Sequence, residues 1–531
     1  MKNFDSFGVM IDCSRNAVPS VEGLKKFFMI ISKMGYNYAM LYTEDTYEVD
    51  GEPFFGYKRG RYSVQELSEL DAYAASVGIE LIPCIQTLAH LRTILRWDEY
   101  RPIYDIDDII LADEERTYTL VENMFKTLRR ALKTNKIHIG MDEAHNVGLG
   151  RYLDKHGFTN RYELLMRHLE KVCDIAKKYG FEPMMWSDMF FRLVSHGAYN
   201  PVDGFPKEIK DHVPDNVTLV YWDYYHEDAE YYEKMIDSHK MLSGKVAFAG
   251  GAWCWGNFAP HQIVSNRRND IAIPACKRKG VKNVLLTMWG DNGGECPYVS
   301  VLASLMHAAA LAEGMTPDEE RAKFKEITGE SYQAFLDLDL PNHIYGEKTT
   351  VGTAAYCKQH LYNDIFLGIL DESAEGKYDA PTVYRGYAEK FKKYAGESKS
   401  FSYLFESAAA LCSALEVKFD LGKKVRAAYA ARDREALEKT ANGDIPECIA
   451  RVKKFYEAFR DQWYAVNKTY GFEVQEARLG GLMLRLESCR ERLLDYVGGK
   501  IDSIAELDEP VLVNDRGGMN EWSRMFTANV V

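Results

Sequence analysis

The sequence predicts an α/β fold, a (β/α)8 (TIM) barrel, followed by an all-α C-terminal domain. Eight apolar runs rich in β-branched and aromatic residues occur in the first 320 of 531 residues, and segments with helical periodicity separate most of them. Parallel strands need helical crossovers, and barrel closure removes both sheet edges. An open doubly wound sheet is the alternative. It would normally carry a glycine-rich phosphate loop after an early strand, and none is visible.

The strands and helices of the expected barrel alternate along the chain. Clear helical patterns cover residues 21–35, 119–133 and 161–180, and the first and third end in Gly, which is common at helix C-termini. The expected strands are FGVMID (7–12), YAMLYT (38–43), ELIPCI (80–85), KIHIGM (136–141), PMMWSD (183–188), VTLVYW (217–222), VAFAGG (246–251) and NVLLTMW (283–289).

From about residue 320 the strand patterns give way to charged stretches rich in Ala and Leu, such as residues 403–439 and 448–468. One hydrophobic core rarely organises 531 residues, so we expect a barrel domain over residues 1–320 and a helical domain over residues 321–531. The non-periodic end, residues 511–531, is interpreted as a packed tail. The alternative is that this tail contacts a neighbouring active site.

Composition narrows the classes of partner. Hydrophobic residues make up 46% of the chain and charged residues 27%, which is typical of a soluble globular protein. The net charge of −13 disfavours nucleic acid and anionic membranes as partners. We expect no signal peptide, no membrane span and a cytoplasmic location. The ten Cys form no CxxC pair, so we expect reduced core thiols, no metal and no other cofactor.

Aromatic and charged residues gather at the ends of the expected strands, where the loops of this fold carry function. Indole faces match the apolar face of a pyranose, and Asp, Glu and Arg match its hydroxyl rim, so these residues favour a carbohydrate pocket. A quaternary-ammonium site would also use aromatic residues, but it would have less need of Arg15 and of so many acids. In strand order these residues are Asp12 and Arg15; Glu44 and Asp45; His90; Asp142 and Glu143; Trp186 and Asp188; Trp222, Asp223, Tyr224 and Tyr225; Trp253 and Trp255; and Trp289, Asp291 and Glu295.

The segment HIGMDEAHNVG (138–148) places Asp142 and Glu143 side by side. Adjacent residues of a regular strand point to opposite faces, so the strand must end or bulge here if both are to reach one ligand. Burial and mutual repulsion would then raise the pKa of one carboxyl while the other stays ionised. Such a pair suits the cleavage of a glycosidic bond. The alternative is that the two acids cap the next helix or pair with surface Lys.

The HIGMDE segment resembles the His-x-Gly-x-Asp-Glu signature of family 20 glycoside hydrolases, the β-N-acetylhexosaminidases. The resemblance extends over residues 5–315, to DCSRNAV, YTED, QTLAHL and WGDNGGE. The chain is similar to the compact branch of the family, which lacks an α+β domain before the barrel and has a helical domain after it. The resemblance implies exo-acting hydrolysis of terminal non-reducing β-GlcNAc or β-GalNAc through an oxazolinium ion formed by the 2-acetamido group of the substrate. This family is an exception to the scheme in which two enzyme carboxylates do the chemistry.

The resemblance also implies roles for individual residues. Glu143 would be the general acid and base, and Asp142 would orient the acetamide and stabilise its developing positive charge. Arg15 would bind the O3 and O4 hydroxyls, and Asp291 the O4/O6 side. His90 would support the catalytic acid together with one carboxylate, and the choice between Glu44 and Asp45 stays open. Trp186, Trp222 and Trp289 would line the box around the N-acetyl group and the sugar ring, and Trp253 is a further candidate for binding the substrate.

One feature departs from the family pattern. The family usually places a Tyr after the seventh strand to bind the acetamide oxygen, whereas this chain has Trp253 and Trp255 there. Tyr224 or Tyr225 is a candidate for that hydroxyl. The long loop over residues 49–62 would either roof the pocket or be a plain surface loop.

Two other function classes remain as alternatives. One is a retaining barrel glycosidase in which Asp291 or Glu295 faces Glu143 as nucleophile, and the other is a sugar-binding protein without turnover. The expected ligand is a small oligosaccharide or glycoside with a terminal N-acetylhexosamine. The branch resemblance also implies a homodimer.

Overall fold

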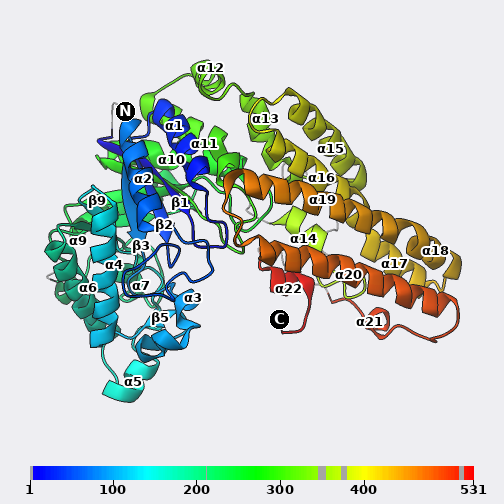
Figure 1. The fold of residues 1–531 in the computed structure, drawn as a ribbon, viewed down its shortest axis with the longest axis horizontal. Helices are drawn as coiled ribbons and strands as arrows, with labels where there is room; N and C mark the ends of the chain where they lie inside the picture. Colours follow the sequence, from blue (N-terminus) through cyan, green and yellow to red (C-terminus); the bar gives the residue numbers. More distant parts are fainter. Residues whose placement is uncertain (1–3, 211, 345–354, 372–378, 513–519, 531) are drawn as a thin grey trace.

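The computed structural model describes residues 4–210, 212–344, 355–371, 379–512 and 520–530, and its first part is a closed barrel of eight parallel strands (Figure 1). The strands follow the order β1-β10-β9-β8-β7-β6-β3-β2 around the barrel, so the predicted fold class is confirmed. The barrel strands are β1 (Ser6–Asp12), β2 (Tyr38–Thr43), β3 (Glu80–Ile85), β6 (Lys136–His138), β7 (Glu182–Trp186), β8 (Thr218–Trp222), β9 (Val246–Gly251) and β10 (Asn283–Met288).

Helices on the outside of the barrel connect these strands. Helix α1 shows why the chain turns where it does: the Ser20 side chain accepts from the N–H of Gly23, and Gly35 ends the helix with a φ of 107°. The barrel helices are α1 (Val21–Met34), α2 (Val64–Ser76), α3 (Arg92–Leu95), α4 (Glu115–Ala131), α5 (Arg151–His156), α6 (Arg161–Lys178), α7 (Asp188–Arg192), α8 (Lys207–Lys210), α9 (Ala229–Leu242), α10 (Gln262–Arg278) and α11 (Leu302–Glu313).

Between β3 and α4 the chain adds a short antiparallel pair, β4 (Tyr104–Ile106) and β5 (Ile109–Ile110), which the sequence did not predict. Strands of three and two residues are too short to show an alternating pattern. This pair lies in the segment that follows His90, so it extends the loops at the carboxyl end of the barrel.

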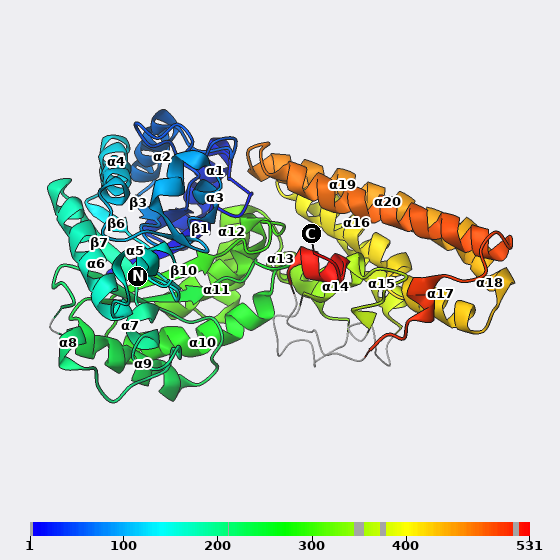
Figure 2. The same cartoon turned by 90° about the horizontal axis from the view of Figure 1, so that it is seen from below.

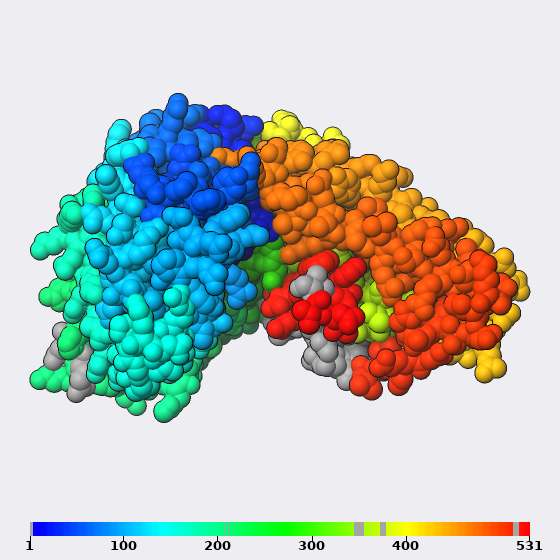
Figure 3. All heavy atoms as spheres, turned by 60° about the horizontal axis from the view of Figure 1, so that its bottom comes forward, coloured from blue at the N-terminus to red at the C-terminus, as the bar shows by residue number. Residues whose placement is uncertain are grey.

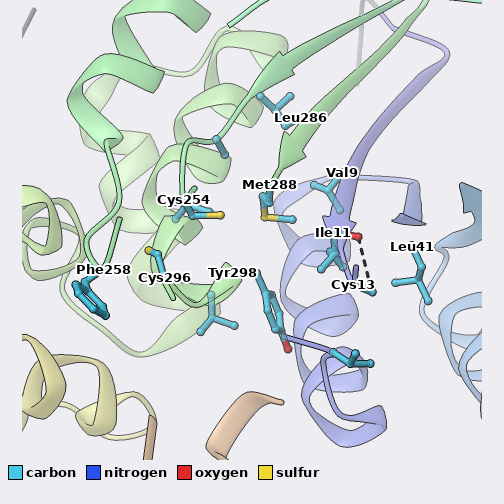
Figure 4. Close-up of a cluster of buried hydrophobic side chains, with 14 of the residues drawn as sticks. Val9, Ile11, Cys13, Leu41, Cys254, Phe258, Leu286, Met288, Cys296 and Tyr298 are labelled. Carbon is cyan, nitrogen blue, oxygen red and sulfur yellow. Dashed lines mark hydrogen bonds between the residues drawn. The ribbon is translucent and has the colours of Figure 1, made fainter. Parts of the chain in front are cut away.

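Alternate residues of the barrel strands belong to two separate apolar layers. Val9 and Ile11 of β1 lie in the outer layer against the helices, while Met10 between them points into the barrel. Figure 4 shows part of the outer layer, in which Cys13 Sγ donates a 3.6 Å hydrogen bond to the carbonyl of Ile11. All ten Cys are free and buried, which confirms the interpretation of the cysteines as core thiols.

The inner layer continues upward into the aromatic residues at the carboxyl end of the barrel. Met10, Tyr42 and Leu285 of the barrel interior belong to the same buried cluster as Trp186 and Trp289. The interior is therefore a packed core whose upper surface forms the floor of any site at this end.

The chain after the barrel is helical in the residues described, and the long helices α19 (Ile445–Val466) and α20 (Phe472–Val497) run side by side away from the barrel (Figures 1 and 2). The predicted domain boundary, between residues 320 and 321, lies inside helix α12 (Pro317–Thr328). The division of the chain into two domains at this point stays a prediction. The remaining helices are α13 (Tyr332–Leu336), α14 (Tyr356–Tyr362), α15 (Ala380–Glu397), α16 (Ser402–Lys418), α17 (Leu421–Ala430), α18 (Arg434–Lys439), α21 (Ala505–Asp508) and α22 (Trp522–Phe526).

The end of the chain packs onto the helical region. Met525 of α22 is fully buried, and α22 contacts α14. In Figure 3 this red segment lies between the barrel and the outer part of the orange helices. The described helices include none whose length and apolar character would suit a membrane span.

Candidate active site

The carboxyl ends of the barrel strands surround a pocket. Of the residues predicted to be catalytic, to bind the substrate or to support the catalytic acid, all but Glu44, Asp45 and Trp253 line this pocket. The lining residues are Arg15, His90, Asp142, Glu143, Trp186, Trp222, Tyr224, Tyr225, Trp255, Trp289 and Asp291.

Asp142 and Glu143 both reach this pocket because β6 ends early, at His138. Gly140, Met141 and Glu143 then take left-handed backbone conformations, with φ of 72°, 70° and 52°. This path breaks the strand alternation that would send the two carboxylates to opposite faces. The expectation that the strand ends before the acidic pair is confirmed.

A neighbouring strand end fixes this unusual backbone. Gln86 Oε1 accepts from the N–H of Met141 (3.1 Å), and Gln86 Nε2 donates to Asp142 Oδ1 (2.7 Å). A Cβ on Gly140 would lie 2.1 Å from Gln86 Oε1, so the turn requires glycine both for its φ and for the room that it leaves. Gln86 was not among the predicted site residues, since nothing in the sequence relates it to the turn after β6.

Gly140→Ala should destabilise the protein more than Gly180→Ala. Gly180 has nearly the same φ (71°) but nothing within 4 Å of its added Cβ, so it isolates the backbone strain, about 1 kcal/mol. The clash with Gln86 should add roughly 1–3 kcal/mol at Gly140. Thermal unfolding of the two variants measures the difference. Equal losses would mean that the Gln86 contact does not constrain the turn.

Asp142 is held in its ionised form. His90 Nε2 lies 3.2 Å from Asp142 Oδ2. Burial alone would raise the pKa of Asp142, but the charge and hydrogen bond of His90 and the hydrogen bond from Gln86 outweigh it and lower that pKa. Burial also opposes the charge of His90, yet Asp142 raises the pKa of His90 to about 10. The two groups therefore form an ion pair in the wall of the pocket.

Glu143 has the opposite shift. Burial and then the negative charge of Asp142 raise its pKa, while its side chain keeps 44% of its accessible surface. The pair thus has the opposed pKa shifts that the sequence predicts. A carboxyl whose pKa is raised and that is open to the pocket is suited to donate a proton to a ligand there.

Asp188 supports the backbone of Glu143 and was not assigned to the site. Its Oδ2 accepts from the N–H of Glu143 (3.2 Å) and from Arg192 Nε (3.0 Å), and its side chain is fully buried. Burial and then the charge of Asp142 raise the pKa of Asp188 to about 7. Its position at a strand end was visible in the sequence, but its contact with Glu143 was not.

Arg15 lies among three carboxylates: those of Asp12, Glu44 and Asp291. Its Nη1 is 2.9 Å from Asp12 Oδ2, its Nη2 is 3.5 Å from Glu44 Oε1, and its Nε is 3.6 Å from Asp291 Oδ1. The guanidinium also lies over Trp289, 5.3 Å from the ring centre. These contacts direct Arg15 and Asp291 to the same edge of the pocket.

The carboxylates around His90 include one that the sequence did not predict. Asp108 Oδ2 lies 3.8 Å from His90 Nδ1. Of the two predicted partners, Glu44 is near enough for its charge to help raise the pKa of His90. Asp45 instead pairs with Arg59 Nε (3.3 Å), and burial raises the pKa of Glu44 to about 7. Asp108 follows β4 in the segment whose structure the sequence did not predict, so its position could not be inferred.

Aromatic rings form the floor and one wall of the pocket. Trp186 and Trp289 have ring centres 5.9 Å apart, and Trp222 stacks on Tyr224 at 5.5 Å. The hydroxyl of Tyr224 accepts a 3.0 Å hydrogen bond from Trp289 Nε1. An indole and phenol surface of this kind suits the apolar face of a sugar ring.

Trp255, and not the predicted Trp253, contributes to this wall. Trp253 stacks behind Trp255 with ring centres 3.9 Å apart, and its Nε1 donates to the carbonyl of Trp255 (3.1 Å). Trp253 is therefore a supporting residue. Tyr225, which is 56% exposed, lies at the rim.

The structure decides between two pairs of alternatives that the sequence left open. Glu295 does not line the pocket: it pairs with Lys358 (2.5 Å) and Arg478 (2.8 Å) of the helical region, so it cannot act as a nucleophile facing Glu143. The loop over residues 49–62 does not line the pocket, so it does not form a roof over it. Its Arg59 instead donates to the carbonyl of Ser14. No group of three or more His, Cys, Asp or Glu among the described residues could hold a metal ion.

Comparison with known proteins gives matches over both parts of the chain. The protein-family model "Glycosyl hydrolase family 20, catalytic domain" matches residues 6–242. The protein-family model "Glycoside Hydrolase 20C C-terminal domain" matches residues 333–526. Hexosaminidase D from Homo sapiens is 24% identical over 344 residues, covering 59% of this chain and 67% of the relative. Hexosaminidase D from Bos taurus is 24% identical over 253 residues, covering 45% and 68%.

Solved structures with similarity to this chain include the GH20 β-N-acetylhexosaminidase from Streptomyces coelicolor A3(2), with a TM-score of 0.45 and 16% identity. Another is the β-N-acetylhexosaminidase from Bacteroides fragilis NCTC 9343, with a TM-score of 0.47 and 20% identity. Each similarity covers 61% of this chain and 70% of the other.

Proposed function

The chain belongs to glycoside hydrolase family 20, and from this premise we propose that it is an exo-acting β-N-acetylhexosaminidase that works by substrate-assisted retention. Its substrate would be a small oligosaccharide or glycoside with a terminal non-reducing β-GlcNAc or β-GalNAc. The human and bovine relatives are named hexosaminidase D, which supports the assignment.

The observation that carries the proposal is the pair of adjacent acids that line one pocket with opposed pKa shifts. In the first step the acetamido oxygen of the substrate attacks the anomeric carbon while Glu143 gives its proton to the departing glycosidic oxygen. The Asp142 carboxylate accepts a hydrogen bond from the acetamide N–H and stabilises the positive charge that develops on the oxazolinium ring.

In the second step Glu143, now a carboxylate, takes a proton from water as the water oxygen bonds to the anomeric carbon. The bond from the acetamide oxygen to that carbon breaks, which restores the acetamide and leaves the sugar with its original configuration. The burial that raises the pKa of Glu143 supports its protonated form before the first step.

The remaining lining residues would bind the sugar. Arg15 and Asp291 share one edge of the pocket and suit ring hydroxyls, and Trp289 offers an apolar face. The Tyr224 hydroxyl accepts from Trp289 Nε1, so its own hydrogen can be directed to the acetamide oxygen. We assign to Tyr224 the role that a Tyr after the seventh strand usually has in this family.

Hydrolysis of p-nitrophenyl-β-GlcNAc and p-nitrophenyl-β-GalNAc, with and without a thiazoline mimic of the bicyclic intermediate, tests this proposal. We expect release of nitrophenol that the thiazoline blocks in competition with substrate. Turnover that is insensitive to the thiazoline would support an enzyme nucleophile, for which Asp291 is the candidate carboxylate besides Asp142 and Glu143 in the pocket lining. Absence of turnover on both substrates would contradict the proposed activity.

A further inference from the structure

The loop that follows β10 carries Asp291 and contacts the helical region. Asn292, Gly293 and Gly294 are three consecutive residues with positive φ, of 65°, 130° and 63°. Glycine adopts positive φ without steric cost, so the two glycines allow several backbone paths here. Contacts with neighbouring residues must select one of these paths, and several of those contacts come from the helical region.

Helix α20 holds two consecutive carbonyls of the loop. Arg478 Nη1 donates to the carbonyl of Asn292 (2.6 Å), and Gln475 Nε2 donates to the carbonyl of Gly293 (3.1 Å). Residues 475 and 478 are three positions apart and therefore share one face of the helix. A Cβ on Gly293 would lie 2.5 Å from Arg478 Nη1, so the Arg478 side chain packs directly on the loop backbone.

A buried ion cluster locks the end of the same loop. Glu295, whose side chain is 1% exposed, lies between Arg478 (2.8 Å) and Lys358 of α14 (2.5 Å). From the C-terminal segment, Asn520 Oδ1 accepts from Asn292 Nδ2 (2.8 Å). Since an unpaired buried charge is costly, Glu295 strongly favours the docked arrangement of loop and helices.

The opposite face of the loop belongs to the pocket. Asp291 lines it beside Arg15, and the N–H of Gly290 donates to Asp12 Oδ2 (2.8 Å), the same oxygen that pairs with Arg15. One short loop therefore touches the helical region with its backbone carbonyls and Glu295, and the pocket with the side chain of Asp291.

We propose that helix α20 positions Asp291 through Arg478 and Gln475 and thereby sets the affinity of the pocket for the terminal sugar. This inference rests on the proposed function, in which Asp291 binds sugar hydroxyls. Arg478 and Gln475 act as positioning residues, because they touch the loop and do not line the pocket.

Arg478→Met tests the proposal in the full chain. Glu295 keeps its partner Lys358 in this variant, so we expect it to fold. Displacement of Asp291 should raise KM for p-nitrophenyl-β-GlcNAc about ten- to a hundredfold, the effect of losing a hydrogen bond to a charged group, with kcat changed by less than about threefold. A fall in kcat with unchanged KM would overturn the proposal.

Arg485→Met is the matched control. Arg485 lies two turns further along α20 and pairs with the buried Asp364 (2.6 Å) inside the helical region, without contact to the β10 loop. Its removal disturbs the same helix and an equally buried ion pair, so a loss of stability alone would appear here too. We expect KM to stay within about twofold of the original. An equal rise of KM in both variants would overturn the positioning role.

A double-mutant cycle with Asp291→Ala separates this inference from the function on which it rests. If Arg478 acts through Asp291, Arg478→Met should change KM by less than about twofold when Asp291 is already Ala. Equal effects in both backgrounds, or an unchanged KM in Asp291→Ala alone, would overturn the inference and leave the hydrolase activity standing. Absence of turnover in the unmodified chain would remove the proposed function and this inference together.

Discussion

Replacement of Glu143 by Gln lowers kcat/KM about 10²- to 10⁴-fold on β-GlcNAc glycosides with poor leaving groups, such as a disaccharide. The amide keeps the size of the carboxyl but cannot give a proton to the departing oxygen. A p-nitrophenolate group leaves without protonation, so the same variant should lose much less in the first step on p-nitrophenyl-β-GlcNAc.

The comparison of the two substrates is the measurement that checks the acid role. Steady-state kinetics on the two substrates would give the ratio of the two losses in kcat/KM. Thermal unfolding of the variant would check that it is folded. Equal losses on the two substrates would mean that Glu143 does not protonate the leaving group.

Replacement of Asp142 by Asn lowers kcat about 10²- to 10³-fold on either substrate, which is the usual effect of removing one electrostatic contact to a transition state. Asp142 would act on the acetamide, so the loss should not depend on the leaving group. The amide also leaves His90 without the ion-pair partner that raises its pKa to about 10. The pKa of His90 should therefore fall in this variant, which NMR of the imidazole would measure.

Asp108→Asn is the control for Asp142. It removes a carboxylate 3.8 Å from the other nitrogen of His90 without touching the pocket. We expect it to lower kcat less than tenfold, because it acts only through His90. An unchanged kcat in Asp142→Asn, or equal losses in the two variants, would contradict a direct role for Asp142 at the acetamide.

The barrel could be predicted because its strands are buried on both faces and therefore appear as continuous apolar runs. Seven of the eight expected strands lie within about two residues of their observed ends. The exception is β6, which the apolar pattern extended to Met141 although the strand ends at His138. The residues beyond it are apolar because they are buried, and the positive φ values that end the strand leave no trace in hydrophobicity.

The site was predicted as a set of residues, but its internal contacts were not. Strand ends meet at one end of a barrel, which is why Asp142, Arg15 and Asp291 could be brought together from the sequence. Distances between loops are not encoded in any local pattern. The sequence therefore could not relate Asp108 to His90, nor decide which of Trp253 and Trp255 lies in front.

The pairing of Glu295 with cations of the helical region could not be predicted either, because it is a contact between segments far apart in the sequence. Its position four residues after Asp291 resembles that of a second pocket acid. Its cationic partners, Lys358 and Arg478, lie on helices that no local pattern in the sequence would place beside the loop.

The continuity between barrel interior and pocket floor limits how ligand preference can be redesigned. Trp186 and Trp289 belong to the same buried cluster as Met10 and Tyr42, so exchanging either indole would also open a void in the strands below. Directed evolution toward other glycans should therefore start from Tyr225, whose side chain is exposed at the rim of the pocket. Substitutions there should change the free energy of unfolding little.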